Sequence, residues 1–252
     1  LKEQGLSSEY VIEVQTTIDQ SLQSYAQARL GEESAAVVVI DCENGDLVSI
    51  ASAPSYDPNL FIGGISSADY NPLLNSKYRP LVNKTVQGAY PPGSTFKMVV
   101  ALAALEEGLV TPGETVFCPG HMKLGKRKFH CWRRGGHGWV GLRKSLEQSC
   151  DVYYYEIARR VGIEKIGEMA RKLGLGLDLD LPVAALRSGL IPTKEWKRRE
   201  RDTEWLVGDT LNSGIGQGFV LATPVQLAVM TARIAAGNGV QPRLIRARGG
   251  QP

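Results

Sequence analysis

The chain has 252 residues, of which 43% are hydrophobic and 22% are charged. These values are typical of globular proteins and argue against a disordered chain or a small disulfide-rich protein. The formal net charge of +3 is too small to indicate nucleic-acid binding by itself, and no segment interleaves basic and aromatic residues as a single-strand platform would. No apolar run reaches the roughly 18 residues of a membrane span. The sequence therefore predicts one large globular domain with room for a small appendage.

The first part of the chain predicts a helix, a β-hairpin and a long surface excursion. Apolar residues at helical spacing indicate a helix that begins near Thr17. The β-branched run 35–40, a turn signal at 43–46 and a second apolar run at 47–51 predict the hairpin. Residues 53–92 are rich in Pro, Gly, Asn and Ser, which is typical of a loop excursion that borders a functional site.

The remaining chain predicts mainly helices. A helix that begins near Ser94 should be buried, because its apolar residues occur on nearly all sides. Residues 111–141 have a loop-like composition with three histidines, two cysteines and many basic residues. We expect further helices over 142–160 and 164–173, and a last one that opens at Thr223 with proline in its first turn.

Ser94 and Lys97 form a Ser-x-x-Lys motif at the start of the predicted buried helix. Residues three apart lie on one helix face, so the hydroxyl and the amine can share a proton. The N–H groups and positive dipole at a helix N-terminus favour an alkoxide, and a desolvated lysine can act as its base. A capping serine beside a solvated lysine is the alternative, and the motif alone leaves both interpretations open.

Ser149-Cys150-Asp151 is a second candidate element, and a helical segment follows it. A second hydroxyl near a nucleophile can relay a proton, and an aspartate two residues later can hold the lysine or the substrate. The alternative is structural, with Ser149 or Asp151 serving as the N-cap of the following helix.

Together these motifs resemble a known enzyme family. A Ser-x-x-Lys motif with a second serine triplet is part of the signature of penicillin-binding proteins. Longer segments are similar to class B penicillin-binding proteins and most of all to their elongation-specific type, the penicillin-binding protein 2 group. The resemblance covers about residues 16–239 and includes TTIDQSLQ, AAVVVIDCENGDLVSIASAPSYDPN, YPPGSTFK, SLEQSCDVYYYE and GIGQGFVLATPVQLA.

The resemblance implies an α/β (α+β) fold of the penicillin-binding protein and serine β-lactamase type, with a five-stranded antiparallel sheet between helix layers. Residues 1–16 would be a linker from an upstream region and residues 17–252 the transpeptidase domain. The family's Lys-Thr-Gly motif, which follows the glycine-rich segment 214–218, does not occur, and Lys84-Thr85-Val86 lacks the glycine and precedes Ser94. We therefore expect a domain that is incomplete at its C-terminus. In the family this strand supplies half of the oxyanion hole, so its absence weighs against activity of the chain as it stands.

The resemblance also implies a reaction. Ser94 would attack the penultimate D-Ala of a peptidoglycan stem peptide, with Lys97 as base and Ser149 as proton relay, and Asp151 stands where many relatives have asparagine. The acyl group would pass to an amine of a neighbouring stem peptide during cell elongation, and β-lactams would trap the same serine. The implied partners are stem peptides, β-lactams, the glycan polymerase RodA and the scaffold MreC, with no nucleic acid. The implied place is the periplasmic face of the bacterial inner membrane, to which the parent protein would be anchored.

Two other functions stay open at this point. A serine β-lactamase would have to deacylate quickly with water, and no glutamate in a recognisable loop is evident for that step. A penicillin-sensing receptor domain or an inactive scaffold would share the slow deacylation of a transpeptidase, so only cross-linking activity or a cell-shape phenotype separates them.

Three cysteines and a histidine form a third candidate group. Cys118, Cys131, His137 and Cys150 have the spacing C-x12-C-x5-H-x12-C, which suits a tetrahedral zinc site. A disulfide, favoured by the oxidising compartment of the family, and buried free thiols are the alternatives. The resemblance favours a structural zinc ion, because elongation-specific relatives are described with a zinc site in this segment that has mixed His, Cys and carboxylate ligands.

The residues around this group have simpler interpretations. His121 and His130 lie close to it in sequence, and Cys42 is expected to be packed or exposed in a turn. We expect the basic cluster to be a solvated loop face, with attraction to anionic headgroups or peptidoglycan as the alternative; its members are Lys123, Lys126, Arg127, Lys128, Arg133 and Arg134.

Overall fold

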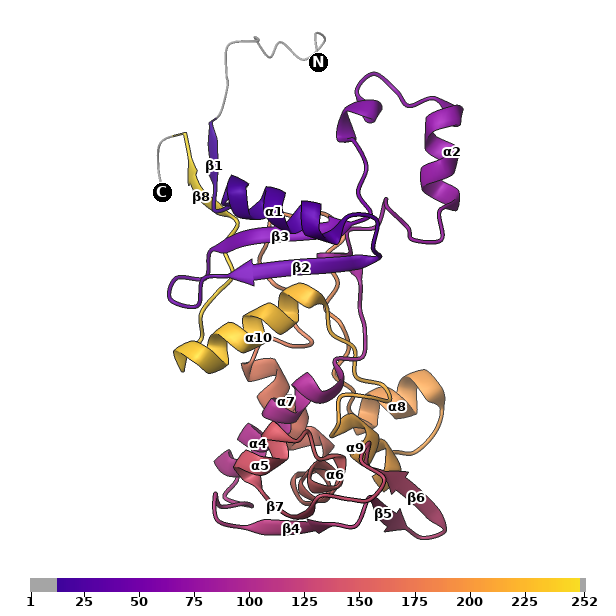
Figure 1. Cartoon of the computed structure of the whole chain (residues 1–252), viewed down its shortest axis with the longest axis vertical. Helices are drawn as coiled ribbons and strands as arrows, with labels where there is room; N and C mark the ends of the chain where they lie inside the picture. Colours follow the sequence, from indigo (N-terminus) through magenta and orange to yellow (C-terminus); the bar gives the residue numbers. More distant parts are fainter. Residues whose placement is uncertain (1–12, 250–252) are drawn as a thin grey trace.

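Residues 13–249 are described by a computed structural model, shown in Figure 1. Most of the expected linker, residues 1–12, lies outside the described residues. Figure 1 shows an elongated arrangement, with a β-hairpin in one half, a group of helices in the other, and helix α10 (Pro224–Ala236) between them. No helix among the described residues is long and apolar enough to cross a membrane.

An antiparallel hairpin flanked by helices forms the first half. Strands β2 (Ala35–Ile40) and β3 (Leu47–Ala53) pair as the β-branched pattern predicts. Helix α1 (Gln20–Leu30) packs on β3, and α10 packs on β2 from the other side (Figure 1). Asp19 caps α1 by accepting a hydrogen bond from the Leu22 N–H at 2.8 Å. The mixed α/β fold class with an antiparallel sheet between helices is confirmed.

The strands outside this hairpin form separate pairs. β1 (Val14–Thr16) pairs with β8 (Ile245–Arg248), so the last three residues of the expected linker range are paired with a strand of the domain. Every sheet among residues 13–249 has two strands. The five-stranded sheet that the resemblance implies is therefore not formed by the described residues, whose contribution between the helix layers is β2 and β3.

The second half is built around helix α6 (Asp151–Val161). Its tyrosines Tyr153 and Tyr154 are at most 1% exposed, and α4 (Lys97–Glu106), α7 (Ile163–Lys172) and α9 (Val207–Ser213) pack around this core. The expectation of a buried helix from Ser94 is confirmed. Its first turn, η3 (Gly93–Phe96), is a 3₁₀ turn that leads directly into α4.

Two expectations for the segment between α4 and α6 are wrong. Residues 111–141 form two antiparallel strand pairs instead of a loop. β5 (His121–Leu124) and β6 (Arg127–His130) form a hairpin, and β4 (Thr115–Cys118) pairs with β7 (Gly138–Gly141) on either side of it in the chain. Each strand has only four residues and many of them are charged, so alternation in the sequence is too short to detect.

The single helix expected over 142–160 is also wrong, because it is two helices. α5 (Leu142–Glu147) ends before Ser149, which has φ +50°, and α6 begins at Asp151. A residue in the left-handed region cannot continue a right-handed helix. The break turns the chain at the Ser-Cys-Asp triplet.

Shorter helices complete the chain. The excursion over 53–92 contains η2 (Pro58–Phe61), α2 (Ser67–Asn75) and α3 (Lys84–Gln87), and α2 projects away from the body in Figure 1. Helix α8 (Lys194–Arg201) precedes α9 and carries most of its basic residues in its last turn.

A buried carboxylate joins the hairpin turn to the C-terminal segment. Asp46 is 1% exposed, and Arg243 Nε and Arg246 Nη2 each donate to it at 2.6 Å. Burial alone would raise the pKa of Asp46, but the hydrogen bonds and charges of the two arginines outweigh burial and hold it below its usual value. A lowered pKa in the folded state means that the stabilisation is present at neutral pH and is lost as the pH falls through that pKa.

We expect Asp46→Asn to lower the free energy of unfolding at pH 7 by about 1–2 kcal/mol, because charged hydrogen bonds to half-exposed arginines are lost. The difference from the unaltered protein should shrink as the pH falls below the pKa of Asp46. Urea unfolding across pH values tests this, with Glu43→Gln in the same turn as the control. A difference that stays constant down to acidic pH would contradict the ion-pair account.

Candidate functional site

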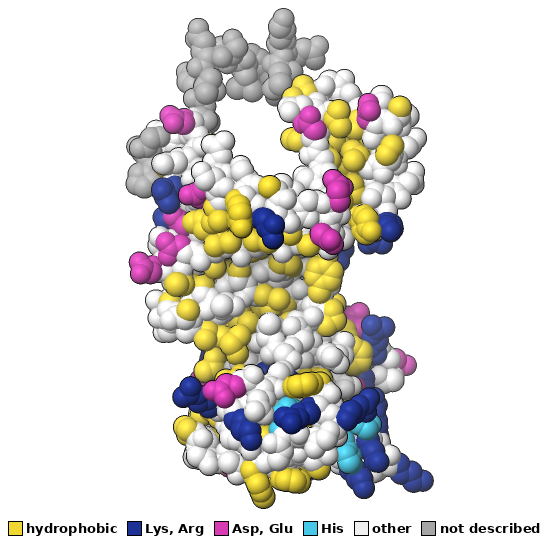
Figure 2. All heavy atoms as spheres, in the orientation of Figure 1, with side chains coloured by type: hydrophobic (Ala, Val, Ile, Leu, Met, Phe, Trp, Pro, Cys, Tyr) yellow, Lys and Arg dark blue, Asp and Glu magenta, His cyan; other side chains and the backbone are white. Residues whose placement is uncertain are grey.

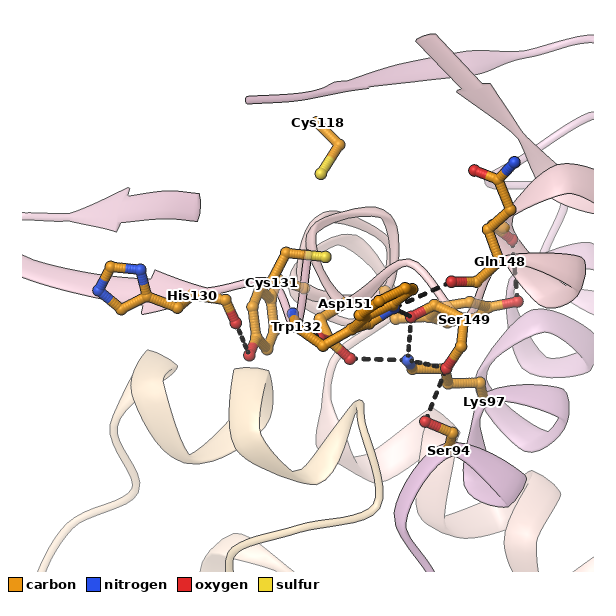
Figure 3. A network of polar contacts seen from close by, with 12 residues as sticks. Ser94, Lys97, Cys118, His130, Cys131, Trp132, Gln148, Ser149 and Asp151 are labelled. Carbon is orange, nitrogen blue, oxygen red and sulfur yellow. Dashed lines mark hydrogen bonds and ion pairs between the residues drawn. The ribbon is translucent and has the colours of Figure 1, made fainter. Parts of the chain in front are cut away.

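The four residues expected to carry chemistry form one hydrogen-bonded network (Figure 3). Lys97 is 1% exposed, and its Nζ donates to Asp151 Oδ1 at 2.7 Å, the Ser149 carbonyl at 2.8 Å and Ser149 Oγ at 2.9 Å. Ser149 Oγ in turn donates to Ser94 Oγ at 2.7 Å. All three donors of an ammonium group are thus engaged, and Ser149 stands between Ser94 and Lys97.

The turn that carries Ser94 is held in place by the glycine-rich segment 214–218. The Gly93 N–H donates to the Gly216 carbonyl at 2.9 Å, and a Cβ on Gly216 would lie 2.1 Å from the Gly93 carbonyl oxygen. Gly216 also has φ +68°. Glycine is therefore required there, because any side chain would push the segment away from the turn that presents Ser94.

The break between α5 and α6 places Ser149 and Asp151. Because Ser149 adopts φ +50°, both its hydroxyl and its carbonyl reach Lys97 Nζ. Asp151 is the first residue of α6 and is 13% exposed, with one carboxylate oxygen on Lys97. A buried lysine paired with a carboxylate and two further oxygens avoids the cost of an isolated buried charge.

Trp132 is a residue that the sequence did not single out. Its backbone N–H donates to Asp151 Oδ2 at 2.8 Å, and its indole Nε1 donates to the carbonyls of Gln148 at 3.0 Å and Ser149 at 3.1 Å. Figure 3 shows the indole lying across the Ser149 turn. In the sequence only its position next to Cys131 could have pointed to Trp132 as a site residue, because an exposed tryptophan in a loop follows no periodic pattern.

The network opens into a cavity of about 570 Å³. Ser94 and Ser149 lie at its wall, and the indole of Trp132, Arg134 and Gln217 line it as well. Asp151 is the one carboxylate among the described lining residues, and both of its oxygens are occupied by Lys97 and Trp132. The cavity therefore has the hydroxyl of Ser94 at its wall, and no free carboxylate among the described lining residues lies beside it.

The structure also brings together the four expected metal ligands. Cys118, Cys131, His137 and Cys150 are all buried, and their candidate ligand atoms lie within 4.8 Å of one another. His137 Nδ1 is 3.6 Å from Cys118 Sγ and 3.5 Å from Cys131 Sγ. A tetrahedral zinc ion places such ligand atoms about 3.5–3.8 Å apart. The two nitrogen–sulfur distances match that spacing, and the donor set of three thiols and an imidazole fits zinc. All three cysteines have free thiols here, without the disulfide that was one alternative.

Local chemistry at this group is consistent with ligation. Burial lowers the pKa of His137, with a smaller effect of Arg133, which favours the neutral imidazole that binds metals. Burial raises the pKa of the Cys150 thiol, and a cation among the three sulfurs would favour its thiolate. Gly136 makes the approach possible, because a Cβ there would lie 2.2 Å from the Cys118 carbonyl oxygen.

The other residues named from this region lie apart from the metal group. His121 and His130 face each other across β5 and β6 with ring centroids 6.0 Å apart, outside the four-residue group. The six residues of the basic cluster are all exposed, and basic and histidine side chains gather over this hairpin in Figure 2. Cys42 is exposed.

Comparison with known proteins identifies the family. The model of the penicillin binding protein transpeptidase domain matches residues 35–249. The chain belongs to this family. It is 43% identical to the peptidoglycan D,D-transpeptidase MrdA of Escherichia coli over 218 residues, which are 86% of this chain and 34% of that protein. The chain thus spans about a third of the length of this curated relative.

Solved structures agree with this assignment. The chain is similar to penicillin-binding protein 2 (PBP2) of Pseudomonas aeruginosa, with a TM-score of 0.92 and 42% identity over 96% of this chain and 56% of that one. It is also similar to PBP2 of Helicobacter pylori in its complex with MreC, with a TM-score of 0.90 and 36% identity over 95% of this chain and 45% of that one. The family and fold expected from the motifs are confirmed.

The left-handed backbone at Ser149 predicts which of two substitutions there is the more stable. Replacement by glycine or alanine removes the same hydroxyl, but only alanine retains the penalty for positive φ. We expect Ser149→Gly to be more stable than Ser149→Ala by about 1 kcal/mol in chemical denaturation. Ser145 within α5 is the matched control, and there glycine should be less stable than alanine by about 1 kcal/mol. Alanine that is more stable than glycine at position 149 as well would show that the break is not held in the left-handed region.

Proposed function

We propose that this chain is the acyl-transfer segment of a peptidoglycan D,D-transpeptidase that cross-links stem peptides during cell elongation. The observation that carries the proposal is the network Ser94–Ser149–Lys97–Asp151 at the wall of an open cavity. Membership of the transpeptidase family and the 43% identity to a peptidoglycan D,D-transpeptidase support the reaction and the substrate.

In the proposed reaction Ser94 Oγ attacks the carbonyl of the penultimate D-Ala of a stem peptide. When Lys97 is unprotonated these two hydrogen bonds reverse. The Ser94 proton then passes to Ser149 Oγ, 2.7 Å away, as Ser149 gives its own proton to Lys97 Nζ at 2.9 Å. The proton then returns to the nitrogen of the terminal D-Ala, which leaves. An amine of a neighbouring stem peptide then attacks the carbonyl of the Ser94 ester and gives a proton to Lys97. That proton passes through Ser149 to Ser94 Oγ as the ester bond breaks. Throughout this cycle Asp151 keeps Lys97 Nζ positioned next to Ser149 by accepting its hydrogen bond.

The structure disfavours the β-lactamase alternative. A β-lactamase that activates water with a carboxylate would need a free one at the cavity, and among the described lining residues the one carboxylate is already bound to Lys97 and Trp132. β-Lactams would therefore acylate Ser94 and remain attached, as would be expected of a target enzyme. A penicillin-sensing receptor would behave in the same way, and formation of cross-linked dimers of stem peptides separates the two.

The proposal extends to place and partners. We propose that the protein acts at the periplasmic face of the inner membrane, where stem peptides are accessible, and that it does so together with MreC and RodA. The similarity to the PBP2 of Helicobacter pylori that forms a complex with MreC supports the first partner, and the family resemblance supports the second.

We also propose a structural zinc ion held by Cys118, Cys131, His137 and Cys150. Four buried ligand atoms within 4.8 Å, three of them thiols, are the observation that supports it. The ion would link the end of β4 and the loop between β6 and β7 to the start of α6, and would contribute folding energy. Because Cys131 precedes Trp132 and Cys150 follows Ser149, the site would brace the network from two sides.

We expect a penicillin to add one drug mass to the protein and Ser94→Ala to abolish the adduct, because the hydroxyl is the attacking group. The assay is intact-mass spectrometry on a form of the protein that includes the Lys-Thr-Gly element. Thr95→Ala next to it serves as the control and should still be labelled. An adduct that persists in Ser94→Ala would place the nucleophile elsewhere.

For the metal, elemental analysis should find about one zinc per chain. Cys131→Ser should lose it, with a fall in the free energy of unfolding of about 3 kcal/mol or more, because ligation contributes directly to folding. Cys42→Ser removes an exposed thiol outside the group and should change neither quantity. A metal-free protein with a Cys118–Cys131 disulfide would overturn the zinc proposal.

A further inference from the structure

A second cavity, of about 420 Å³, lies beside α3 and shares no lining residue with the cavity at Ser94. Its charged lining residues are all cations, with no aspartate or glutamate among them: Lys77, Arg79, Lys84 and Arg187. These side chains come from the segment between α2 and α3, from helix α3 itself and from the loop before α8. Tyr78, Val82 and Tyr90 add aromatic and aliphatic surface to the same wall.

Lys84 is the unusual member of this set. It is only 6% exposed, yet it forms no ion pair, and the one acceptor found for Nζ among the described residues is the Arg79 carbonyl at 3.4 Å. An ammonium group has three donors, and a buried one without a counter-charge is costly. Accordingly, burial holds the pKa of Lys84 below its usual value. Lys97 and Lys197 are also buried, but each has a carboxylate oxygen at 2.7 Å from its Nζ.

The three exposed cations around Lys84 are also without acidic partners. Among residues 13–249 no ion pair is formed by Lys77, Arg79 or Arg187. Like charges that converge on one cavity repel one another, and this arrangement gains stability when an anion enters.

The backbone fixes where these side chains start. The Arg187 N–H donates to the Val86 carbonyl at 3.0 Å, which ties the loop before α8 to α3. Arg79 has φ +49°, a conformation that few residues other than glycine adopt, and Lys77 lies over the ring of Tyr78 at 4.6 Å. The cations therefore project from positions set by the fold around the cavity mouth, with Lys84 at its buried wall.

We propose that this cavity is a binding site for an oxyanion of the phosphate class, with Lys84 as the buried counter-charge and Arg79 and Arg187 as guanidinium donors. Guanidinium groups bind two oxygens of one phosphate in parallel, and four cations call for a ligand with more than one negative charge. The phosphate is carried either by a small molecule or by a lipid headgroup. Tyr78 and Tyr90 also line the cavity and offer aromatic surface to the organic part of such a ligand.

Inorganic phosphate is the first probe, with binding measured by isothermal titration calorimetry at constant ionic strength. We expect saturable binding of one phosphate per chain, weakened about tenfold or more by Lys84→Met and by Arg187→Gln, because each removes a charge-assisted hydrogen bond. Arg187 is exposed and its side chain bonds no described residue, so Arg187→Gln should fold normally if Lys84→Met does not. Acetate, with a single charge, should bind at least about tenfold more weakly than phosphate.

Lys126→Gln on the exposed β5–β6 turn is the matched control and should bind phosphate as the unaltered chain does. Sedimentation with phosphatidylglycerol vesicles identifies the carrier. Vesicle binding that Arg187→Gln abolishes and Lys126→Gln retains supports a lipid headgroup, whereas phosphate binding without vesicle binding supports a small molecule. Equal loss in Arg187→Gln and Lys126→Gln, or no loss in Arg187→Gln with either probe, would overturn the proposal.

Discussion

The buried position of Lys97 is the constraint on which the active region depends. An ammonium group that is 1% exposed must find acceptors within the protein, and here three oxygens from the Ser149 turn and Asp151 supply them. Two of those oxygens belong to Ser149, whose hydroxyl also reaches Ser94. Satisfying the lysine and aligning the two serines are therefore the same structural requirement.

That requirement explains the surrounding architecture. The left-handed residue at Ser149 ends α5 and restarts the chain as α6, which brings a hydroxyl, a carbonyl and a carboxylate to one point. Trp132 then holds the turn by bonds to the carbonyl of Ser149 and the carboxylate of Asp151. The proposed zinc site includes the residues next to both Trp132 and Ser149, so a metal held there would stiffen the network without touching it.

The sequence predicts which residues lie together where the signal is local or chemical, and it misses contacts that depend on the tertiary fold. The Ser-x-x-Lys helix, the first hairpin and the four-residue Cys and His group follow from periodicity and ligand type, and the structure brings each set together. The break at Ser149 has no breaker residue such as glycine or proline to announce it, because the energy that offsets positive φ comes from Lys97, 52 positions away. The Trp132 contacts and the unpaired Lys84 are likewise visible only once distant segments are placed.

The central claim is that Lys97 takes the Ser94 proton through Ser149. The most direct measurement is the rate of acylation by a penicillin for Lys97→Arg in a form of the protein that includes the Lys-Thr-Gly element. Arginine keeps the charge and can bond Asp151 but stays protonated, so we predict a rate at least about 100-fold below that of the unaltered protein, with Ser94 still the labelled residue. Acylation by Lys97→Arg at close to the original rate would contradict the account.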